Sequence, residues 1–195
     1  MNYDLIIVGA GPAGIFTALE LLKRKPDSKI LIIEKGQSVE KRHCPKIKTK
    51  KCVHCKPFCH ITTGFSGAGA FSDGKLSLSS EVGGDLPQLI GDDLAQETIN
   101  YTDKIYLEFG ADEHIEGVSN PQAVKEIRKR AIQAGLKLVD CPIRHLGTEK
   151  AQQLYLSIEK HLISNGAEIM FGCECRDLII ENERCIGVYA VSQSG

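Results

Sequence analysis

The stretch LIIVGAGPAG at residues 5–14, followed by KILIIE at residues 29–34, decides the fold of this chain. Residues 5–8 form a short, apolar, β-branched run, which is typical of a strand buried on both faces of a parallel sheet. A helix is expected from Pro12 to about Lys25, because Pro suits the first helical turn and apolar residues then recur at helical spacing. Residues 29–34 read as a second buried strand. Together these segments predict a βαβ unit and an α/β, Rossmann-like fold with a parallel sheet.

The three glycines of this stretch have separate expected roles. Gly9 allows the tight turn after the strand, Gly11 lets the backbone approach a diphosphate, and Gly14 lets the helix pack close to the strand. The helix N-terminus then offers free N–H groups and a partial positive charge to the diphosphate. Glu34 closes the second strand, where its carboxylate can accept hydrogen bonds from an adenosine ribose. The same carboxylate would repel a 2′-phosphate, although Lys35 is adjacent.

Length and composition set the broad class. The chain has 195 residues, a formal net charge of −1 and 42% hydrophobic residues, which fits a globular protein with one core and perhaps an insertion. Near-neutral charge gives no reason to expect nucleic acid or an anionic membrane as a partner. No apolar run reaches the ~18 residues of a membrane span, and the N-terminus has no export signal. We therefore expect a cytoplasmic protein with no membrane partner.

The remaining periodicity outlines the domain organisation. Regular patterns disappear between residues 36 and 84. They return as expected helices at 92–109, 121–134 and 148–164, expected strands at 136–139 and 168–171, and a hairpin over 175–180 and 185–191. We expect residues 1–84 and 149–195 to form the nucleotide-binding domain, and 85–148 to form a mainly helical insertion belonging to a substrate or cap region.

A cluster of cysteines lies in the irregular stretch. Cys44, Cys52, Cys55 and Cys59 have the spacing C-x7-C-x2-C-x3-C, four of the eight cysteines in the chain. Without an export signal, metal or redox chemistry is a better reading than disulfides. Four thiolates could hold zinc or an iron–sulfur cluster, could be reduced thiols without metal, or could include a redox-active dithiol. These three readings stay open, and neighbouring lysines would lower thiol pKa values in each of them.

The sequence also resembles known flavoproteins. DLIIVGAGPAG at 4–14 with IIEKG at 32–36 is similar to the FAD signature of glutathione-reductase-type flavoproteins. More narrowly, HCP at 43–45, the pair Cys52-x-x-Cys55, GFSGAGAFSDGKL at 64–76 and RHLGT at 144–148 resemble a bacterial family of uncharacterised FAD-dependent dehydrogenases, related to geranylgeranyl reductases and flavin hydroxylases. The resemblance implies FAD as cofactor, and we expect it to be contacted by Gly9, Gly11, Pro12, Ala13, Gly14, Glu34, Lys35, Gly67, Ala68, Gly69, Ala70 and the main chain of Cys175.

The glycine- and serine-rich run at 64–75 has two readings. Small residues permit close backbone approach, and consecutive N–H groups can cradle an anion or a flavin edge, whereas the composition also suits a flexible surface loop. Arg144 and His145 could serve substrate or flavin, or could belong to a capped turn. Cys141 and Cys185 are expected in the core.

The resemblance also predicts what lies outside this sequence. Family members are usually more than twice as long, so we expect an incomplete, N-terminal portion with an exposed apolar sheet edge and a tendency to self-associate. The expected function is an FAD-dependent oxidoreductase that acts on an unknown small molecule, with no assignable catalytic residue. The alternatives are a non-catalytic ADP- or FAD-binding fragment with a cysteine-bound metal, or a flavin-linked dithiol/disulfide oxidoreductase.

Overall fold

The computed structural model describes residues 2–192, and these divide into two compact units. The first unit contains the residues up to 71 and those from 155 onwards, and the second contains residues 72–154. The insertion predicted at 85–148 lies within the second unit. None of the described helices is long and apolar enough to cross a membrane.

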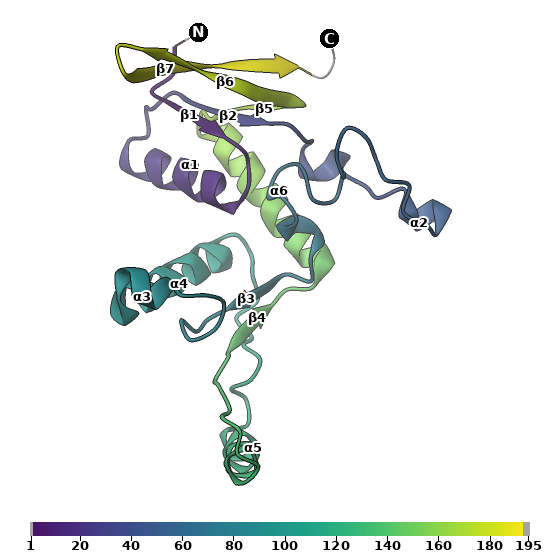
Figure 1. The fold of residues 1–195 in the computed structure, drawn as a ribbon, viewed down its shortest axis with the longest axis vertical. Coiled ribbons are helices and arrows are strands. Elements are labelled where there is room, and N and C mark those ends of the chain that lie inside the picture. The colour runs from purple at the N-terminus through teal and green to yellow at the C-terminus, as the bar shows by residue number, and fades with distance from the viewer. Residues whose placement is uncertain (1, 193–195) are drawn as a thin grey trace. The chain divides into compact units, whose positions relative to one another are not determined.

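A three-stranded parallel sheet organises the first unit (Figure 1). Its order is β1 (Leu5–Val8), β2 (Ile30–Glu34), β5 (Glu168–Phe171), with Leu5 opposite Ile30 and Leu31 opposite Glu168. Every residue of the central strand β2 is buried, as expected for a parallel strand covered on both faces. Helix α1 (Pro12–Arg24) connects β1 to β2. The α/β fold with a parallel sheet is therefore confirmed.

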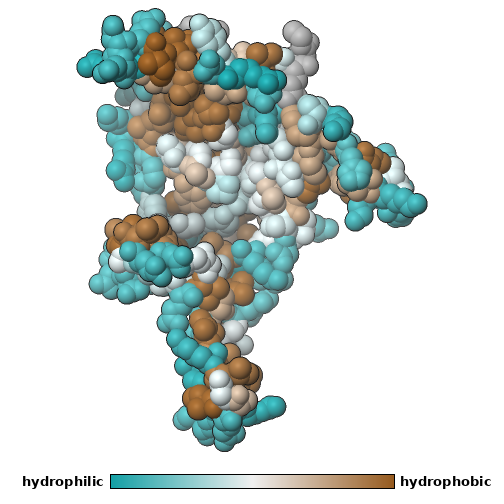
Figure 2. Space-filling model, in the orientation of Figure 1, coloured by the Kyte–Doolittle hydropathy of each residue, from teal (hydrophilic) through white to brown (hydrophobic). Residues whose placement is uncertain are grey.

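The sheet lies between a hairpin and helices. Strands β6 (Cys173–Glu181) and β7 (Arg184–Ser192) pair antiparallel and lie over one face of the sheet, while α1 lies on the other (Figure 1). On the hairpin side, buried Leu31, Ile33 and Cys173 pack with the partly buried Tyr3, Ile6 and Val188. Apolar side chains remain exposed on the hairpin, and Figure 2 shows hydrophobic surface gathered at this end of the unit.

The second unit combines a small antiparallel sheet with helices. Strand β3 (Lys75–Ser77) pairs with β4 (Ile143–His145). The helices are α3 (Leu86–Ile90), α4 (Asp92–Glu108) and α5 (Pro121–Gln133), and α6 (Thr148–Ser164) begins in this unit and continues into the first. Asn120 caps α5 by accepting a 3.0 Å hydrogen bond from the Ala123 N–H.

Three short helices interrupt the irregular stretch. Two predictions outside this stretch, for residues 136–139 and for Cys185, are wrong. A 3-10 helix at Val39–Lys41, helix α2 (Lys46–Thr49) and a 3-10 helix at Gly69–Phe71 interrupt the stretch. The strand predicted at 136–139 is absent, and the chain forms β4 instead, because residues 143–145 find a partner in β3. Cys185 is exposed on β7 and not in the core, since it lies on an open hairpin strand.

Candidate functional site

The turn between β1 and α1 has the geometry that its glycines predict. Gly9 has a φ of +96°, a conformation that L side chains rarely adopt. A Cβ on Gly14 would collide with the Gly9 carbonyl oxygen, so the helix can approach the strand only because Gly14 has no side chain. Gly11 differs from both, because its φ is −74° and a Cβ there would meet nothing within 4 Å. Nothing within the described chain requires glycine at residue 11, and the open space beside it suits a bound group.

The N-terminus of α1 opens onto the same space. Gly11 precedes the first helical residue without any side-chain cap, and the first turn carries no acidic residue. Pro12 has no N–H, while those of Ala13 and Gly14 lack intrahelical acceptors, as at any helix start. Pro12 and Ala13 are exposed. Free donors and the positive end of the helix dipole therefore face a position where a diphosphate would be held.

Glu34 is bound more tightly into the fold than its sequence position suggests. Its side chain is only 6% exposed. One carboxylate oxygen accepts a 2.9 Å hydrogen bond from the Ala10 N–H, and the other accepts a 2.7 Å bond from the Gly36 N–H. Glu34 thus fixes the glycine turn to the end of β2. Each carboxylate oxygen can accept a second hydrogen bond, so the interaction with a ribose hydroxyl stays chemically open. Lys35, next to it, is exposed.

The glycine- and serine-rich loop packs directly against this turn. The Ser66 N–H donates a 2.7 Å hydrogen bond to the Ala10 carbonyl, and the Phe65 N–H donates a 3.0 Å bond to Gln37. Phe65, Ser66 and Ala70 are completely buried, whereas Ala68 is exposed. The structure therefore brings Gly67, Ala68, Gly69 and Ala70 next to the glycine turn, and the loop is anchored by its buried neighbours.

Arg42 holds this loop in place, and sequence reasoning missed it. Its guanidinium is buried and donates to four backbone carbonyls: His60 (2.9 Å), Ile61, Phe65 (2.6 Å) and Gly67 (2.6 Å). The guanidinium carbon also lies 4.5 Å from the centroid of the Phe71 ring. Burial lowers the pKa of Arg42, with the nearby Glu34 and Cys59 opposing the shift. A single arginine among several lysines gave no sequence signal for this role.

The Ser66 hydroxyl is a further polar group in this loop. Its Oγ is buried, and it has no hydrogen-bond partner among the residues that the structure describes. The residue also has a left-handed φ of +68°, which is unusual for a side chain other than glycine. A buried hydroxyl without a partner is costly, so this position fits a site that is completed by a bound group.

The last predicted cofactor contact and the cysteine cluster lie elsewhere in the first unit. Cys175 is partly buried near the start of β6, where its main chain pairs with Ala190. Cys44, Cys52, Cys55 and Cys59 are all free thiols, and all four line one cavity of about 300 Å³. Within the described residues, no group of three or more His, Cys, Asp or Glu side chains is arranged to hold a metal ion.

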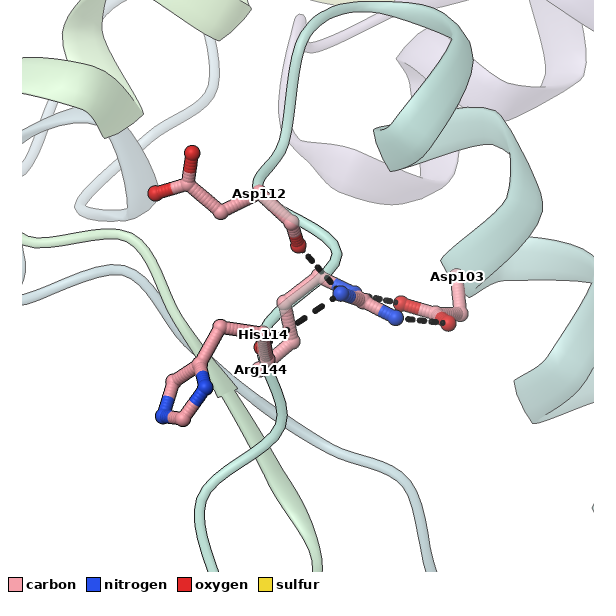
Figure 3. Close-up of polar contacts among 4 residues, drawn as sticks. All are labelled: Asp103, Asp112, His114 and Arg144. Atoms are coloured by element: carbon pink, nitrogen blue, oxygen red, sulfur yellow. Dashed lines mark hydrogen bonds and ion pairs between the residues drawn. The ribbon is translucent and has the colours of Figure 1, made fainter. Parts of the chain in front are cut away.

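In the second unit, the Arg144 guanidinium binds other groups of the protein. It is 3% exposed and forms a two-pronged ion pair with Asp103, with one N–O distance of 2.8 Å (Figure 3). It also donates to the backbone carbonyls of Asp112 and, at 3.5 Å, His114. The Asp103 carboxylate raises the Arg144 pKa. Its donors are thus directed at the protein itself.

The neighbouring polar residues of the second unit form surface pairs. His145 Nδ1 lies 3.0 Å from a Glu116 carboxylate oxygen, and Lys75 lies 2.8 Å from Asp73. Lys75 stands opposite His145 in the β3–β4 register. The Lys75–Asp73 pair is half-exposed, and the Lys75 ammonium lowers the pKa of the Asp73 carboxyl.

Comparisons with known proteins support the fold. No family model matches the chain. It is 42% identical over 72 residues to an uncharacterised protein of Clostridium beijerinckii, a match that covers 37% of this chain and 13% of that protein. Among solved structures it is similar to a 3-ketosteroid-Δ4-(5α)-dehydrogenase from Rhodococcus jostii (TM-score 0.56, 12% identity) and to a glycine oxidase from Bacillus cereus (TM-score 0.52, 17% identity).

These structural matches cover nearly all of this chain but only about half of each solved structure. The dehydrogenase match covers 100% of this chain and 44% of that one, and the oxidase match covers 97% and 53%. The chain therefore spans about half the length of these oxidoreductases. At such low identity the likeness shows a shared fold and nothing more.

Proposed function

We propose that this chain is the FAD-binding portion of an FAD-dependent oxidoreductase. The observation that carries the proposal concerns Gly11. No contact or backbone strain within the described chain requires glycine at this position, yet Gly11 lies beside the free N–H groups of α1. The fold supports it, because the solved oxidoreductases named above share it over about half their length. The resemblance of residues 4–14 and 32–36 to the FAD signature favours FAD over other dinucleotides.

The residues present fit the ADP half of this cofactor. The N–H groups of Ala13 and Gly14 would hold the diphosphate, and Glu34 would accept a hydrogen bond from the ribose. The main chain at Cys175 is the proposed adenine contact. The backbone of Gly67–Ala70, fixed by Arg42, would approach the flavin side of the cofactor. Bound FAD supplies hydride chemistry, and the protein's part is to bind, orient and shield it.

Two glycine variants separate ligand binding from folding. Gly11→Ala fills open space at an ordinary φ, so the thermal midpoint of the ligand-free chain should not fall and should rise slightly, because the unfolded chain loses conformational freedom. FAD affinity should fall by roughly 10- to 100-fold, the equivalent of losing one hydrogen bond to a charged group. Gly14→Ala should instead destabilise the chain without any ligand, because its Cβ collides with the Gly9 carbonyl.

Titration calorimetry with FAD and with ADP, together with thermal unfolding of the ligand-free variants, checks both expectations. ADP should show the same loss in Gly11→Ala as FAD, because the altered contact lies at the diphosphate. If Gly11→Ala binds both nucleotides like the parent, the nucleotide does not lie on this turn and the proposal is wrong.

A further inference from the structure

The cysteine cavity of the first unit is the feature that the nucleotide site leaves unexplained. Four of the eight cysteines line it, and all are free thiols. Lys46, Lys56, His54 and His60 also line the cavity, and no acidic residue does. Apart from α2 and a few turns, this segment has no regular structure, and most of its residues are exposed. Its cysteines are therefore accessible and are not core fillers.

A metal site does not fit the arrangement of these thiols. A structural zinc ion needs four ligands at about 2.0–2.3 Å in a tetrahedron. Nowhere between residues 2 and 192 do three or more potential ligand side chains gather in this way. The four thiols share a cavity without sharing one coordination point, so the arrangement favours chemistry of the thiols themselves.

Cys59 is the thiol whose surroundings differ from the others. The Thr63 N–H donates a 3.1 Å hydrogen bond to the Cys59 carbonyl, which closes a turn after the cysteine. The Arg42 guanidinium donates to the carbonyls of His60 (2.9 Å) and Ile61, the two residues that follow Cys59, and so fixes this turn beside a positive charge. Cys59 is exposed, so a reactant can reach it.

The surroundings of Cys59 favour the charged form of its sulfur. Hydrogen bonding from the backbone at Ile61 and Thr62 and from the Thr62 hydroxyl, with a smaller contribution from the Arg42 guanidinium, holds the pKa of the Cys59 thiol below its ordinary range. The other titratable groups that line the cavity are the ammonium groups of Lys46 and Lys56, the imidazoles of His54 and His60, and the thiols of Cys44, Cys52 and Cys55. The two ammonium groups favour a thiolate, and no carboxylate lines the cavity to oppose it.

We propose that this cavity is a thiol–disulfide exchange site in which Cys59 attacks a disulfide substrate that carries negative charge. The charge preference follows from Lys46 and Lys56 in the lining, which would attract an anionic reactant and repel a cationic one. The proposal goes beyond the flavin chemistry proposed above and does not depend on it.

The exchange balances within the cavity. The Cys59 thiolate attacks one sulfur of the substrate disulfide, forms a mixed disulfide and releases the first substrate thiolate. Cys55, four residues away and lining the same cavity, then loses its proton to solvent and attacks the Cys59 sulfur. An internal Cys55–Cys59 disulfide forms and the second substrate thiolate leaves. Two protein thiols are oxidised and one substrate disulfide is reduced to two thiols.

The test follows the reaction of the full chain with dithiobis-nitrobenzoate, an anionic aromatic disulfide whose released thiolate is coloured. An ordinary thiol with a pKa near 8.5 is only about 3% ionised at pH 7, so a thiol with a lowered pKa carries a larger thiolate fraction, and Cys59 should react measurably faster than Cys185. Cys59→Ser should remove this fast phase. Cys185→Ser, which removes an exposed thiol outside the cavity, should retain it.

Further variants and reagents check the individual steps. Cys55→Ser should release one coloured thiolate in the fast phase where the parent releases two, and peptide mapping should find the Cys55–Cys59 disulfide only in the parent. Thr62→Val should move the pH midpoint of the fast phase upward, because one donor to the sulfur is lost. Cystamine, a cationic disulfide, should react more slowly than the anionic reagent, and salt should reduce the difference.

Three outcomes would overturn the proposal. A fast phase that survives in Cys59→Ser would assign the reactivity to another residue. Equal rates at Cys59 and Cys185 would show that the cavity confers no special reactivity. Stoichiometric zinc or iron in the purified chain, with the four cavity thiols unreactive until a chelator is added, would show that a metal site forms here instead.

Discussion

Glu34→Gln tests whether the carboxylate at the end of β2 locks the glycine turn in place. In the parent, its two oxygens accept hydrogen bonds from the N–H groups of Ala10 and Gly36, at 2.9 and 2.7 Å. A glutamine of the same shape offers one oxygen and one NH₂ group. One of the two backbone N–H groups must then face another donor, and the surviving bond loses the assistance of the negative charge.

The expected cost follows from burial. Glu34 is 6% exposed, so water cannot easily replace the lost acceptor. A buried N–H without an acceptor costs about 1–3 kcal/mol, and a hydrogen bond to a charged group contributes about 1.5–3 kcal/mol. We therefore expect the ligand-free chain to lose about 3 kcal/mol of unfolding free energy, which lowers the thermal midpoint by about 6–12 °C for a chain of this size.

The assay is urea or thermal unfolding of the ligand-free chain, followed by calorimetric measurement of its FAD affinity. Glu181→Gln is the matched control, because Glu181 also ends a strand but is exposed. We expect the control to unfold within about 0.5 kcal/mol of the parent, as surface substitutions usually do. If Glu34→Gln is as stable as the control, the two hydrogen bonds do not hold the turn. The reasoning about this carboxylate is then refuted.

Three other substitutions test the framework around the site. Arg42→Lys should lower the unfolding free energy by about 3 kcal/mol, because a lysine cannot donate to all four carbonyls that share the guanidinium. Urea unfolding measures this loss, and an unchanged unfolding midpoint would contradict the expectation. Asp103→Asn should cost about 3–5 kcal/mol by leaving Arg144 buried without its counter-charge, whereas Asp140→Asn, which breaks an exposed pair, should cost less than about 1 kcal/mol. Burial raises the pKa of the Glu159 carboxyl above its ordinary 4.5, so its contribution to stability is full below that pH and is lost as pH rises through the folded-state pKa. Glu159→Gln should therefore flatten the dependence of stability on pH above about 4.5, and an unaltered pH profile would count against it.

Local sequence patterns predicted the elements whose partners lie close in the chain. The run at 5–8, the helix from Pro12 and the strand ending at Glu34 need only apolar periodicity and the special conformation of glycine. The helix starting at Pro121 was equally readable, since Asn120 and Pro121 are a cap and a first-turn residue whatever surrounds them. Each of these elements depends on residues that lie within about one helical turn of one another in the sequence.

Features that depend on distant partners were not readable in this way. Residues 136–139 have a strand-like composition but no partner, whereas residues 143–145 become β4 because β3, nearly 70 residues earlier, pairs with them. The structural role of Arg144 depends on its ion pair with Asp103, which lies 41 residues earlier in the chain. The Ser66–Ala10 hydrogen bond likewise joins residues that are separated by α1, β2 and the first part of the irregular stretch.

The shared guanidinium of Arg42 has a thermodynamic consequence. Two of its carbonyl partners, His60 and Ile61, directly follow Cys59, and the other two, Phe65 and Gly67, belong to the loop beside the glycine turn. The two segments are therefore held together by one rigid planar group. Any free energy that nucleotide binding gains from ordering the loop must also favour one arrangement of the segment around Cys59. By reciprocity, oxidation or alkylation of that thiol should change nucleotide affinity by the same factor by which the nucleotide changes the equilibrium of the thiol.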